Sequence, residues 1–270
     1  CSCSFLACRA NSAFSPSLTV LIVLRALYGV AMGGEWGVGA SLALETVPAE
    51  TRGLVSGFLQ EGYAVGYLLA AVAFYFLFPI FGWRGMFVVG VVPALLVLYI
   101  RTRVPESPAW EAQRERRETI LTALKGRWGL FIYVVVLMTA FNFFSHGTQD
   151  LYPTFLEVQH HLSTHAVGII AIVYNIGALI GGIFFGALSE QFGRRHTIGL
   201  AALLALPIIP LWAFSEGPVL LATGAFLMQF MVQGACGIVP VHLNELSPAT
   251  ARCTFPGFTY QLGNLLASAN

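Results

Sequence analysis

One stretch of the chain carries polar side chains at the spacing of one helix face, where they could line an ion or substrate pathway. Asn142, Ser145, His146, Gln149 and Asp150 stand at positions i, i+3, i+4, i+7 and i+8. At 3.6 residues per turn they form one polar stripe along an otherwise apolar helix. We expect the stripe to face a water-filled cavity.

His146 and Asp150 are one helical turn apart, so their side chains could hydrogen-bond. Asp150 is the only aspartate in the sequence. A neighbouring carboxylate and burial act in opposite directions on the charge of an imidazole. We expect this pair to bind and release a proton in the physiological range. The alternative, a pair that only fixes helix packing, stays open.

A helix break should follow the stripe. Pro153 cannot donate a backbone hydrogen bond to the carbonyl of Gln149, which predicts a kink at this point. Thr154 extends the polar character beyond it. A polar stripe that ends in a kink is suited to a gated helix that lines a cavity.

Three further charged residues lie within apolar segments: Arg25, Glu35 and Glu61. A charge at the centre of a membrane helix costs about 2.5–3.5 kcal/mol on the insertion scale, so such residues normally face water or a partner. We expect them, with His146 and Asp150, to take part in proton coupling. A buried ion pair that only fixes packing is an equal alternative for these three.

The composition places the chain among membrane proteins. Hydrophobic residues make up 57% of it and charged residues 10%, against roughly 25% charged residues in soluble domains. The net charge of +1 indicates no nucleic-acid partner, and the spacing of the five cysteines fits no set of zinc ligands. No stretch is long enough for a soluble catalytic domain. We therefore expect no enzyme activity, no catalytic residues, no metal site and no cofactor.

Apolar segments of about 20 residues can cross a bilayer as helices. Such segments lie near 17–46, 54–78, 85–102, 128–156, 166–189, 196–214 and 218–245, with partial spans at 1–10 and 255–270. Two glycine pairs, Gly177 with Gly181 and Gly182 with Gly186, have the spacing that lets helix backbones approach. The sequence thus predicts an all-α, multi-pass membrane protein.

The basic residues indicate the orientation. Alternating loops place eleven of the 14 Lys and Arg residues on one side, and only Arg9 and Arg84 on the other. The positive-inside rule makes the first side cytoplasmic. The hydrophilic stretch 105–127 then becomes a cytoplasmic linker, either an amphipathic helix or a solvated flexible segment. The residues on the cytoplasmic side are Arg52, Arg101, Arg103, Arg114, Arg116, Arg117, Lys125, Arg127, Arg194, Arg195 and Arg252.

The chain repeats itself at a constant offset of 200 residues. The set Glu45, Pro48, Ala49, Arg52, Gly57 and Phe58 recurs as Glu245, Pro248, Ala249, Arg252, Gly257 and Phe258. A constant offset predicts a bundle of two parallel, pseudo-symmetric halves in which Arg52 superposes on Arg252. The counterpart of segment 130–156 would precede residue 1, so we interpret the chain as a bundle truncated at both ends.

These residues resemble the major facilitator superfamily. Arg25 with Gly29, Gly33 and Gly34 is similar to the pattern of that fold's fourth helix, whose arginine is linked to proton coupling. A second match resembles the superfamily's cytoplasmic loop between helices eight and nine, although Glu190 replaces the usual aspartate. The residues of this expected gating loop are Gly186, Glu190, Gly193, Arg194 and Arg195. The resemblance implies helices three to six in 1–104, a cytoplasmic linker in 105–127, and helices seven to ten with the start of eleven in 128–270.

A sharper match is similar to the signature of lactate and pyruvate proton symporters in the sialate and lactate permease branch. Its fixed positions are Asn142, Ser145, His146, Thr148, Gln149, Asp150 and Thr154. In that branch the signature is implicated in substrate binding, which we expect here of Asn142, Ser145, His146, Gln149, Asp150 and Thr154.

The resemblance implies proton-coupled symport of a small organic acid, such as lactate or pyruvate, by alternating access. The expected partners are a small organic anion, a proton and the lipid bilayer, and the implied location is a bacterial inner membrane. A sialic acid or sugar-acid symporter and a receptor without transport remain alternatives. The sequence does not indicate an oligomeric state.

Overall fold

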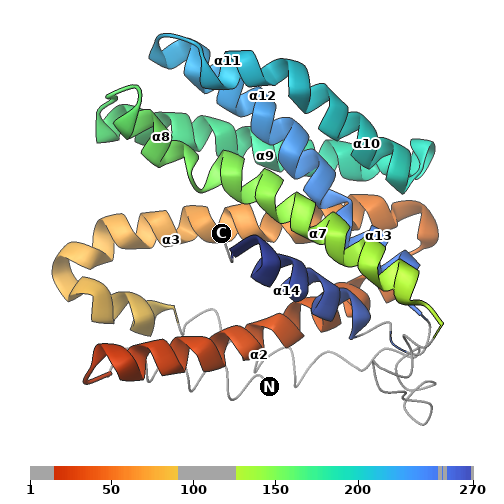
Figure 1. Cartoon of the computed structure of the whole chain (residues 1–270). Helices are drawn as coiled ribbons and strands as arrows, with labels where there is room; N and C mark the ends of the chain where they lie inside the picture. Colours follow the sequence, from red (N-terminus) through yellow and green to blue (C-terminus); the bar gives the residue numbers. More distant parts are fainter. Residues whose placement is uncertain (1–14, 91–125, 249–250, 252–253, 269–270) are drawn as a thin grey trace.

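The computed structural model describes residues 15–90, 126–248, 251 and 254–268, and throughout these ranges the regular structure is helical. Figure 1 shows long helices running side by side. The elements are α2 (Leu18–Glu45), η1 (Ala49–Thr51), α3 (Arg52–Val89), α7 (Trp128–Gln149), α8 (Tyr152–Val158), α9 (Thr164–Phe192), α10 (Arg194–Ala205), η3 (Leu206–Ile208), α11 (Ile209–Ala213), α12 (Pro218–Gly237), α13 (Val239–Leu246) and α14 (Phe255–Ser268).

The predicted spans and the helices agree closely. Four described segments are long and apolar enough to cross a membrane: Trp128–Val158, His165–Phe192, Arg194–Ala213 and Pro218–Leu246. The predicted span 17–46 corresponds to α2, and 54–78 lies within α3. Segment 1–10, most of 85–102 and most of 105–127 lie outside the described residues.

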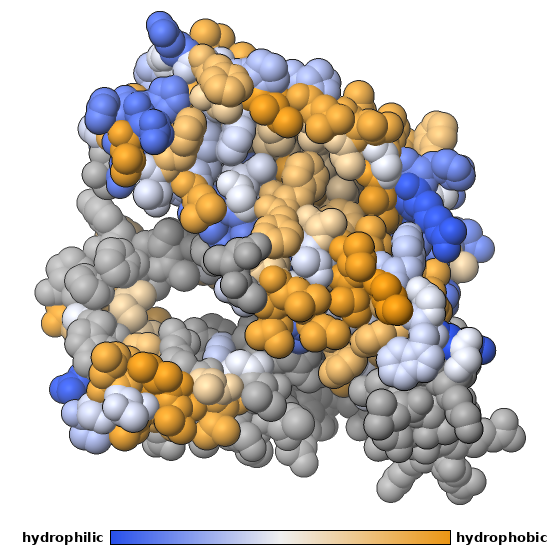
Figure 2. All heavy atoms as spheres, in the orientation of Figure 1, coloured by the Kyte–Doolittle hydropathy of each residue, from blue (hydrophilic) through white to orange (hydrophobic). Residues whose placement is uncertain are grey.

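The outer surface fits a lipid environment. Figure 2 shows apolar residues over the exposed faces of the helices and hydrophilic residues gathered near the two ends of the bundle. Exposed large apolar side chains occur on each of the long helices, for example Ile132 and Val136 on α7 and Leu203 on α10. Water would make such surfaces unfavourable, whereas lipid tails accept them.

The predicted kink after the polar stripe is confirmed. Helix α7 ends at Gln149, and α8 begins at Tyr152 with Pro153 in its first turn. At the break, the amide of Leu151 donates to the carbonyl of His146 over 3.3 Å, five residues back instead of four. The missing amide hydrogen of Pro153 explains why the regular ladder does not continue.

A similar break divides α12 from α13 at Ile238, and the sequence analysis did not anticipate it. Pro240 stands near the start of α13 and cannot donate to the carbonyl of Cys236. Its counterpart at the offset of 200 is Ala40, which lies within the unbroken helix α2. Because proline stands here in the second copy of the repeat and alanine in the first, the helix is interrupted only in the second copy.

The helix bounds otherwise follow the repeat. Helix α2 begins at Leu18 and α12 at Pro218, while α2 ends at Glu45 and α13 at Leu246. The following helices, α3 and α14, begin at Arg52 and Phe255. Arg252 lies outside the described residues, so its predicted superposition on Arg52 stays a prediction.

Both glycine pairs lie where helices pack closely, as the spacing predicted: Gly177 and Gly181 on α9 face α12, whereas Gly182 and Gly186 face α3. A Cβ added to Gly177 would approach the carbonyl oxygen of Phe226 to 2.5 Å, and one added to Gly181 would meet the backbone of Phe230. The largest apolar core joins α7, α12, α13 and α14 around residues such as Met138, Ala235 and Phe255.

Residues 15–90 contact the rest of the bundle mainly near one end, which we call the Arg52 end. It holds η1, the first turns of α3 and the start of α10, and it lies at the right of Figure 1. Ser41 Oγ donates to Asn244 Oδ1 over 2.9 Å. Ser56 Oγ donates to the carbonyl of Gly237 over 2.7 Å and accepts from the amide of Val241 over 3.1 Å. These buried hydrogen bonds join α2 and α3 to α12 and α13.

Candidate functional site

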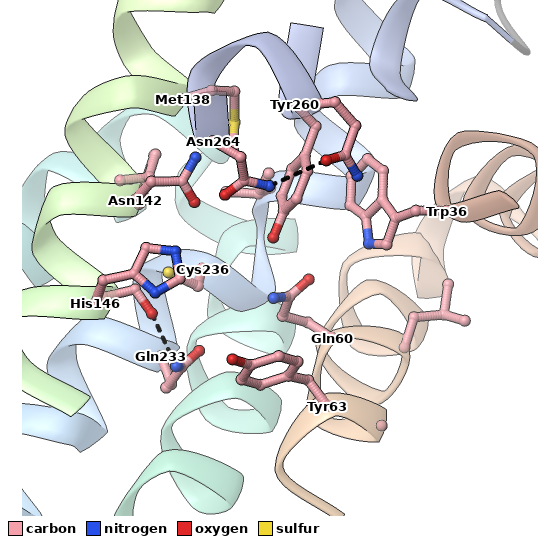
Figure 3. Close-up of a pocket in the computed structure, with 16 residues that line it drawn as sticks. Trp36, Gln60, Tyr63, Met138, Asn142, His146, Gln233, Cys236, Tyr260 and Asn264 are labelled. Atoms are coloured by element: carbon pink, nitrogen blue, oxygen red, sulfur yellow. Dashed lines mark hydrogen bonds between the residues drawn. The ribbon is translucent and has the colours of Figure 1, made fainter. Parts of the chain in front are cut away.

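A cavity of about 440 Å³ lies between residues 15–90 and the C-terminal helices. Helices α2 and α3 contribute to its lining from residues 15–90, and α7, α12, α13 and α14 contribute from the C-terminal part (Figure 3). Its lining is apolar with several carboxamides, and it holds no Asp, Glu, Lys or Arg among the described residues. The lining residues are Trp36, Leu59, Gln60, Gly62, Tyr63, Met138, Phe141, Asn142, Ser145, His146, Gln233, Cys236, Val239, Tyr260, Gln261 and Asn264.

Three residues of the predicted stripe, Asn142, Ser145 and His146, line this cavity from α7. Figure 3 shows the Asn142 and His146 side chains directed toward its interior. The expected contact between His146 and Asp150 is present, since His146 Nδ1 lies 2.6 Å from Asp150 Oδ2. The side chains of this pair are 49% and 38% exposed. Asp150 does not line the cavity itself. It contacts the imidazole of His146, which does.

The expectation that Gln149 also faces the cavity is wrong. Gln149 is buried, and its Oε1 accepts from Gln233 Nε2 over 2.7 Å. Its Nε2 donates to Asn175 Oδ1 over 3.5 Å. Helices α9 and α12 cover this part of the stripe, and Gln233 reaches the cavity in its place. Thr154 is exposed on α8, where the helix break has moved it out of register with the stripe.

Gln233 ties the cavity wall to a polar network inside the C-terminal helices. Besides Gln149, its Nε2 donates to Ser145 Oγ over 3.3 Å. One turn away, Gln229 Nε2 donates to Thr148 Oγ1 over 3.1 Å. Buried amide groups with hydrogen-bond partners fix the positions of neighbouring side chains. The network therefore holds the α7 wall against α12.

The opposite wall consists of residues that the sequence analysis did not single out: Trp36 on α2, Gln60 and Tyr63 on α3, and Tyr260 and Asn264 on α14. The 200-residue repeat contained the signal that could have identified them. The pairs Trp36 with Cys236 and Gln60 with Tyr260 occupy equivalent positions, and all four line the cavity. The cavity thus lies where the two copies of the repeat face each other.

Of the other residues expected in proton coupling, the side chains of Arg25 and Glu35 lie outside the described part of the structure. Glu61 is buried on α3 and packs against α9, so that a Cβ on Gly182 would collide with its carboxyl group. Glu61 Oε1 has no hydrogen-bond partner among the described residues. It lies behind the lining, one residue from Gln60.

Residues of the predicted gating loop connect four helices at the Arg52 end. Arg194 Nη2 lies 3.0 Å from Glu190 Oε2 and 3.3 Å from Glu245 Oε1. The amide of Gly53, at the start of α3, donates to Glu190 Oε1. We call Gly53, Glu190, Arg194 and Glu245 the Arg194 cluster. It connects α3 to α9, α10 and α13 through charge-assisted hydrogen bonds.

The other residues of this loop have different positions. Gly193 separates α9 from α10 with φ of 80°, a conformation that favours glycine. Gly186 packs against the backbone of Gly53. Arg195 lies outside the Arg194 cluster, with its guanidinium 5.7 Å from the centre of the Tyr133 ring. Of the five residues predicted for the gating loop, the structure therefore brings three together around Gly53: Gly186, Glu190 and Arg194.

The described residues contain no group of three His, Cys, Asp or Glu side chains that could hold a metal ion. What the geometry offers is a mainly apolar cavity with several carboxamides between two sets of helices, an imidazole–carboxylate pair at its wall, and an ionic cluster at one end. Such an arrangement can bind a small solute.

The family model described as Major Facilitator Superfamily matches residues 1–269. The chain is 34% identical to a carboxylic acid transporter protein homolog of Saccharomyces cerevisiae, covering 91% of this chain and 44% of that protein. It is 28% identical to the sialic acid transporter NanX of Escherichia coli, covering 93% of this chain and 63% of that protein. The chain therefore spans less than two thirds of these relatives.

The fold has a solved counterpart. A crystal structure of a double tryptophan mutant of XylE superposes with a TM-score of 0.74 over 99% of this chain and 70% of the other, at 20% sequence identity. This similarity concerns the fold alone, an all-helical bundle that passes through the membrane several times. Together with the family match over residues 1–269, it shows that the chain belongs to the Major Facilitator Superfamily.

Proposed function

We propose that this chain belongs to a carrier that moves a small organic acid across the membrane together with a proton. The observation that carries the proposal is the cavity wall on α7, where Asn142, Ser145 and His146 face the space between the two sets of helices. The relatives named as carboxylic acid and sialic acid transporters support an acidic solute. The activity is transport and requires no cofactor, because a proton gradient supplies the free energy.

The carboxylate of the substrate would lie against α7. Asn142 and Ser145 can donate neutral hydrogen bonds to it, and His146 can donate a charge-assisted one when protonated. Gln149 would act indirectly, because it holds Gln233 and through it the Ser145 side of the wall. Asp150 would hold the imidazole in one orientation. Arg25 remains a candidate for a positive charge near the site.

Two acidic groups are candidates for proton exchange. Asp150 contacts an imidazole that reaches the cavity, so a proton bound by the pair is adjacent to the substrate. Glu61 is enclosed between α3 and α9, and an unpaired charge enclosed in this way is costly. We propose that Glu61 carries a proton while α3 and α9 are packed together and exchanges it when they separate. Glu35 stays a third candidate.

Alternating access requires contacts between the halves that can break. We propose that the Arg52 end faces the cytoplasm, as the distribution of Lys and Arg predicts, and that the Arg194 cluster is its gate. The cluster and the Ser56 hydrogen bonds connect α3 to the C-terminal helices at this end, and we propose that these contacts close it. Opening would break them, and the solute would leave toward the cytoplasm.

The division of the chain follows from this assignment. We propose that residues 1–104 belong to the N-terminal half as helices three to six, and that 105–127 is a cytoplasmic linker. Residues 128–270 would then be helices seven to ten and the start of eleven. A bacterial inner membrane fits the proposal.

Lactate and pyruvate are the first substrates to test, because the α7 residues resemble the signature of their symporters. A sugar acid is the second candidate. The carboxamides of Gln60, Gln233 and Asn264 favour it, since each can donate and accept hydrogen bonds as a hydroxylated substrate requires. A receptor that binds without transport is the alternative of another class.

The experiment is counterflow in proteoliposomes that contain the full-length protein. Vesicles loaded with unlabelled acid should accumulate labelled acid from outside, and an inward proton gradient should raise net uptake. Exchange of no organic acid, despite binding of one, would favour the receptor. Exchange that is indifferent to the proton gradient would refute symport and leave a facilitator.

A further inference from the structure

The cavity has two walls of different chemistry. The α7 wall holds His146, which is the only basic residue among the described residues that line the cavity. The opposite wall, built by α2, α3 and α14, offers Trp36, Gln60, Tyr63, Tyr260 and Asn264. These five side chains combine aromatic rings with neutral polar groups. If a carboxylate lies at the α7 wall, the remainder of the substrate meets this aromatic–amide wall.

Trp36 and Tyr260 form the centre of the aromatic–amide wall. Their rings stack with centroids 4.2 Å apart and planes inclined by 24°. The stack joins α2 to α14 and lies across the cavity from His146 in Figure 3. Both residues also pack against the apolar core, which restricts their side-chain rotamers. The result is a broad apolar surface whose position is fixed before any ligand binds.

Polar groups surround this surface. In Figure 3 the Tyr260 hydroxyl points toward the Gln60 amide, and Asn264 lies beside it. Asn264 Nδ2 donates to Gln261 Oε1 over 3.5 Å, whereas Gln60 Oε1 has no hydrogen-bond partner among the described residues. Buried acceptors normally have a donor. A small reorientation of the Gln60 amide would present both a donor and an acceptor to a ligand.

The size of the cavity gives a second indication of the ligand. Its 440 Å³ falls within the roughly 300–1,000 Å³ of pockets that enclose drug-sized molecules. A three-carbon acid bound at the α7 wall would leave most of this space to water, and the aromatic–amide wall would have no contact with it. A ring that carries hydroxyl groups would reach both walls. The ring would pack on the aromatic surface, and its hydroxyls would pair with the carboxamides.

We infer that Trp36, Gln60 and Tyr260 determine the specificity of the site, and that they select a cyclic hydroxy acid whose carboxylate lies beside His146. The inference rests on the proposed function for the place of the carboxylate. It adds a role for three residues on the helices opposite the signature residues of α7. They bind the part of the substrate farthest from its charge.

Equilibrium binding to the purified full-length protein tests this role without requiring transport. The probes are two labelled cyclic hydroxy acids, shikimate and sialic acid, and labelled lactate. The variants Trp36→Leu, Gln60→Ala and Tyr260→Phe each remove one contact from the aromatic–amide wall. Trp128→Leu is the matched control, because Trp128 is an exposed tryptophan on α7 that lies outside the cavity lining.

At least one cyclic acid should bind more tightly than lactate. Each variant should weaken its binding by about two- to thirteenfold, the equivalent of one neutral hydrogen bond or one aromatic contact. The dissociation constant of lactate should change less than about twofold, because lactate at the α7 wall does not contact the substituted side chains and distant sites affect each other only to about this extent. The control should bind all three probes as the wild type does.

Tighter binding of lactate than of both cyclic acids would overturn the inference. An equal loss of affinity for all three acids in the wall variants would also overturn it, since the wall would then serve only the structure of the site. Counterflow of the same acids is measured in parallel. Selective binding that depends on Trp36, without counterflow, would support the inference and refute the carrier.

Discussion

A single methyl group at Gly57 should loosen the closed Arg52 end. Gly57 lies on α3 where this helix touches α9. A Cβ at this position would lie 2.5 Å from the carbonyl oxygen of Gly182, 3.1 Å from its carbonyl carbon and 3.2 Å from the Cα of Ile183. All three atoms belong to the backbone, so no side-chain rotation can relieve the contact. Because real Cβ atoms essentially never come closer than 3.0 Å, α3 and α9 must separate by at least 0.5 Å (3.0 − 2.5).

The size of the effect follows from the cost of overpacking. Extra methyl groups in closely packed sites cost about 1–3 kcal/mol. The higher helix propensity of alanine offsets about 1 kcal/mol in overall stability, but this gain is the same whether the Arg52 end is closed or open. The ratio of closed to open molecules should therefore fall by about five- to 150-fold.

Distances between two spin labels can measure this ratio in the full-length protein. Suitable sites are Glu50 on η1 and Gln191 near the end of α9, since both are exposed at the Arg52 end. Gly57→Ala should transfer population from the short to the long distance. The control is Gly66→Ala on the same helix, where an added Cβ meets no described atom within 4 Å. Equal distance distributions in the two variants would refute the assignment of the α3–α9 contact to the closed state.

The other predictions concern the α7 wall and the gate. Replacing Asp150 with Asn keeps the size of the side chain but removes its titratable group, so proton-driven accumulation should be lost while counterflow persists; unchanged accumulation would leave Asp150 as a packing partner of His146. Gln149→Ala leaves Gln233 without its closest acceptor and should lower the free energy of unfolding by about 1–3 kcal/mol, measured in detergent, where an unchanged value would contradict the buried network. Arg194→Ala removes charge-assisted hydrogen bonds worth about 1.5–3 kcal/mol and should shift the same spin-label distances toward the open state, whereas Arg195→Ala should not.

The positions of the helices could be predicted because they depend on local signals. Apolar length gives the spans, and Pro153 gives the break between α7 and α8. The break at Ile238 has the same cause, since Pro240 follows it, but an apolar span of normal length concealed it. The repeat anticipated which helices correspond. Such signals lie within one segment of the sequence, so they can be interpreted without knowing which helices pack against it.

The site could be predicted only in part, because helical periodicity shows which residues share a face and not what covers that face. The stripe correctly placed Asn142 and His146 on the cavity. It misplaced Gln149, which Gln233 and Asn175 cover from α12 and α9. The aromatic–amide wall was missed since an aromatic residue in an apolar helix is normally a packing residue. Its members come together only when α2, α3 and α14 converge.

Proton movement caused by the substrate tests the central claim most directly. The full-length protein is reconstituted in weakly buffered vesicles, an organic acid is added outside without a proton gradient, and the external pH is recorded. The proposal predicts that the external medium becomes more alkaline as acid and proton enter together, and that Asp150→Asn abolishes this change while labelled acid still exchanges. Entry of the acid with no movement of protons in the wild-type protein would contradict the proposal.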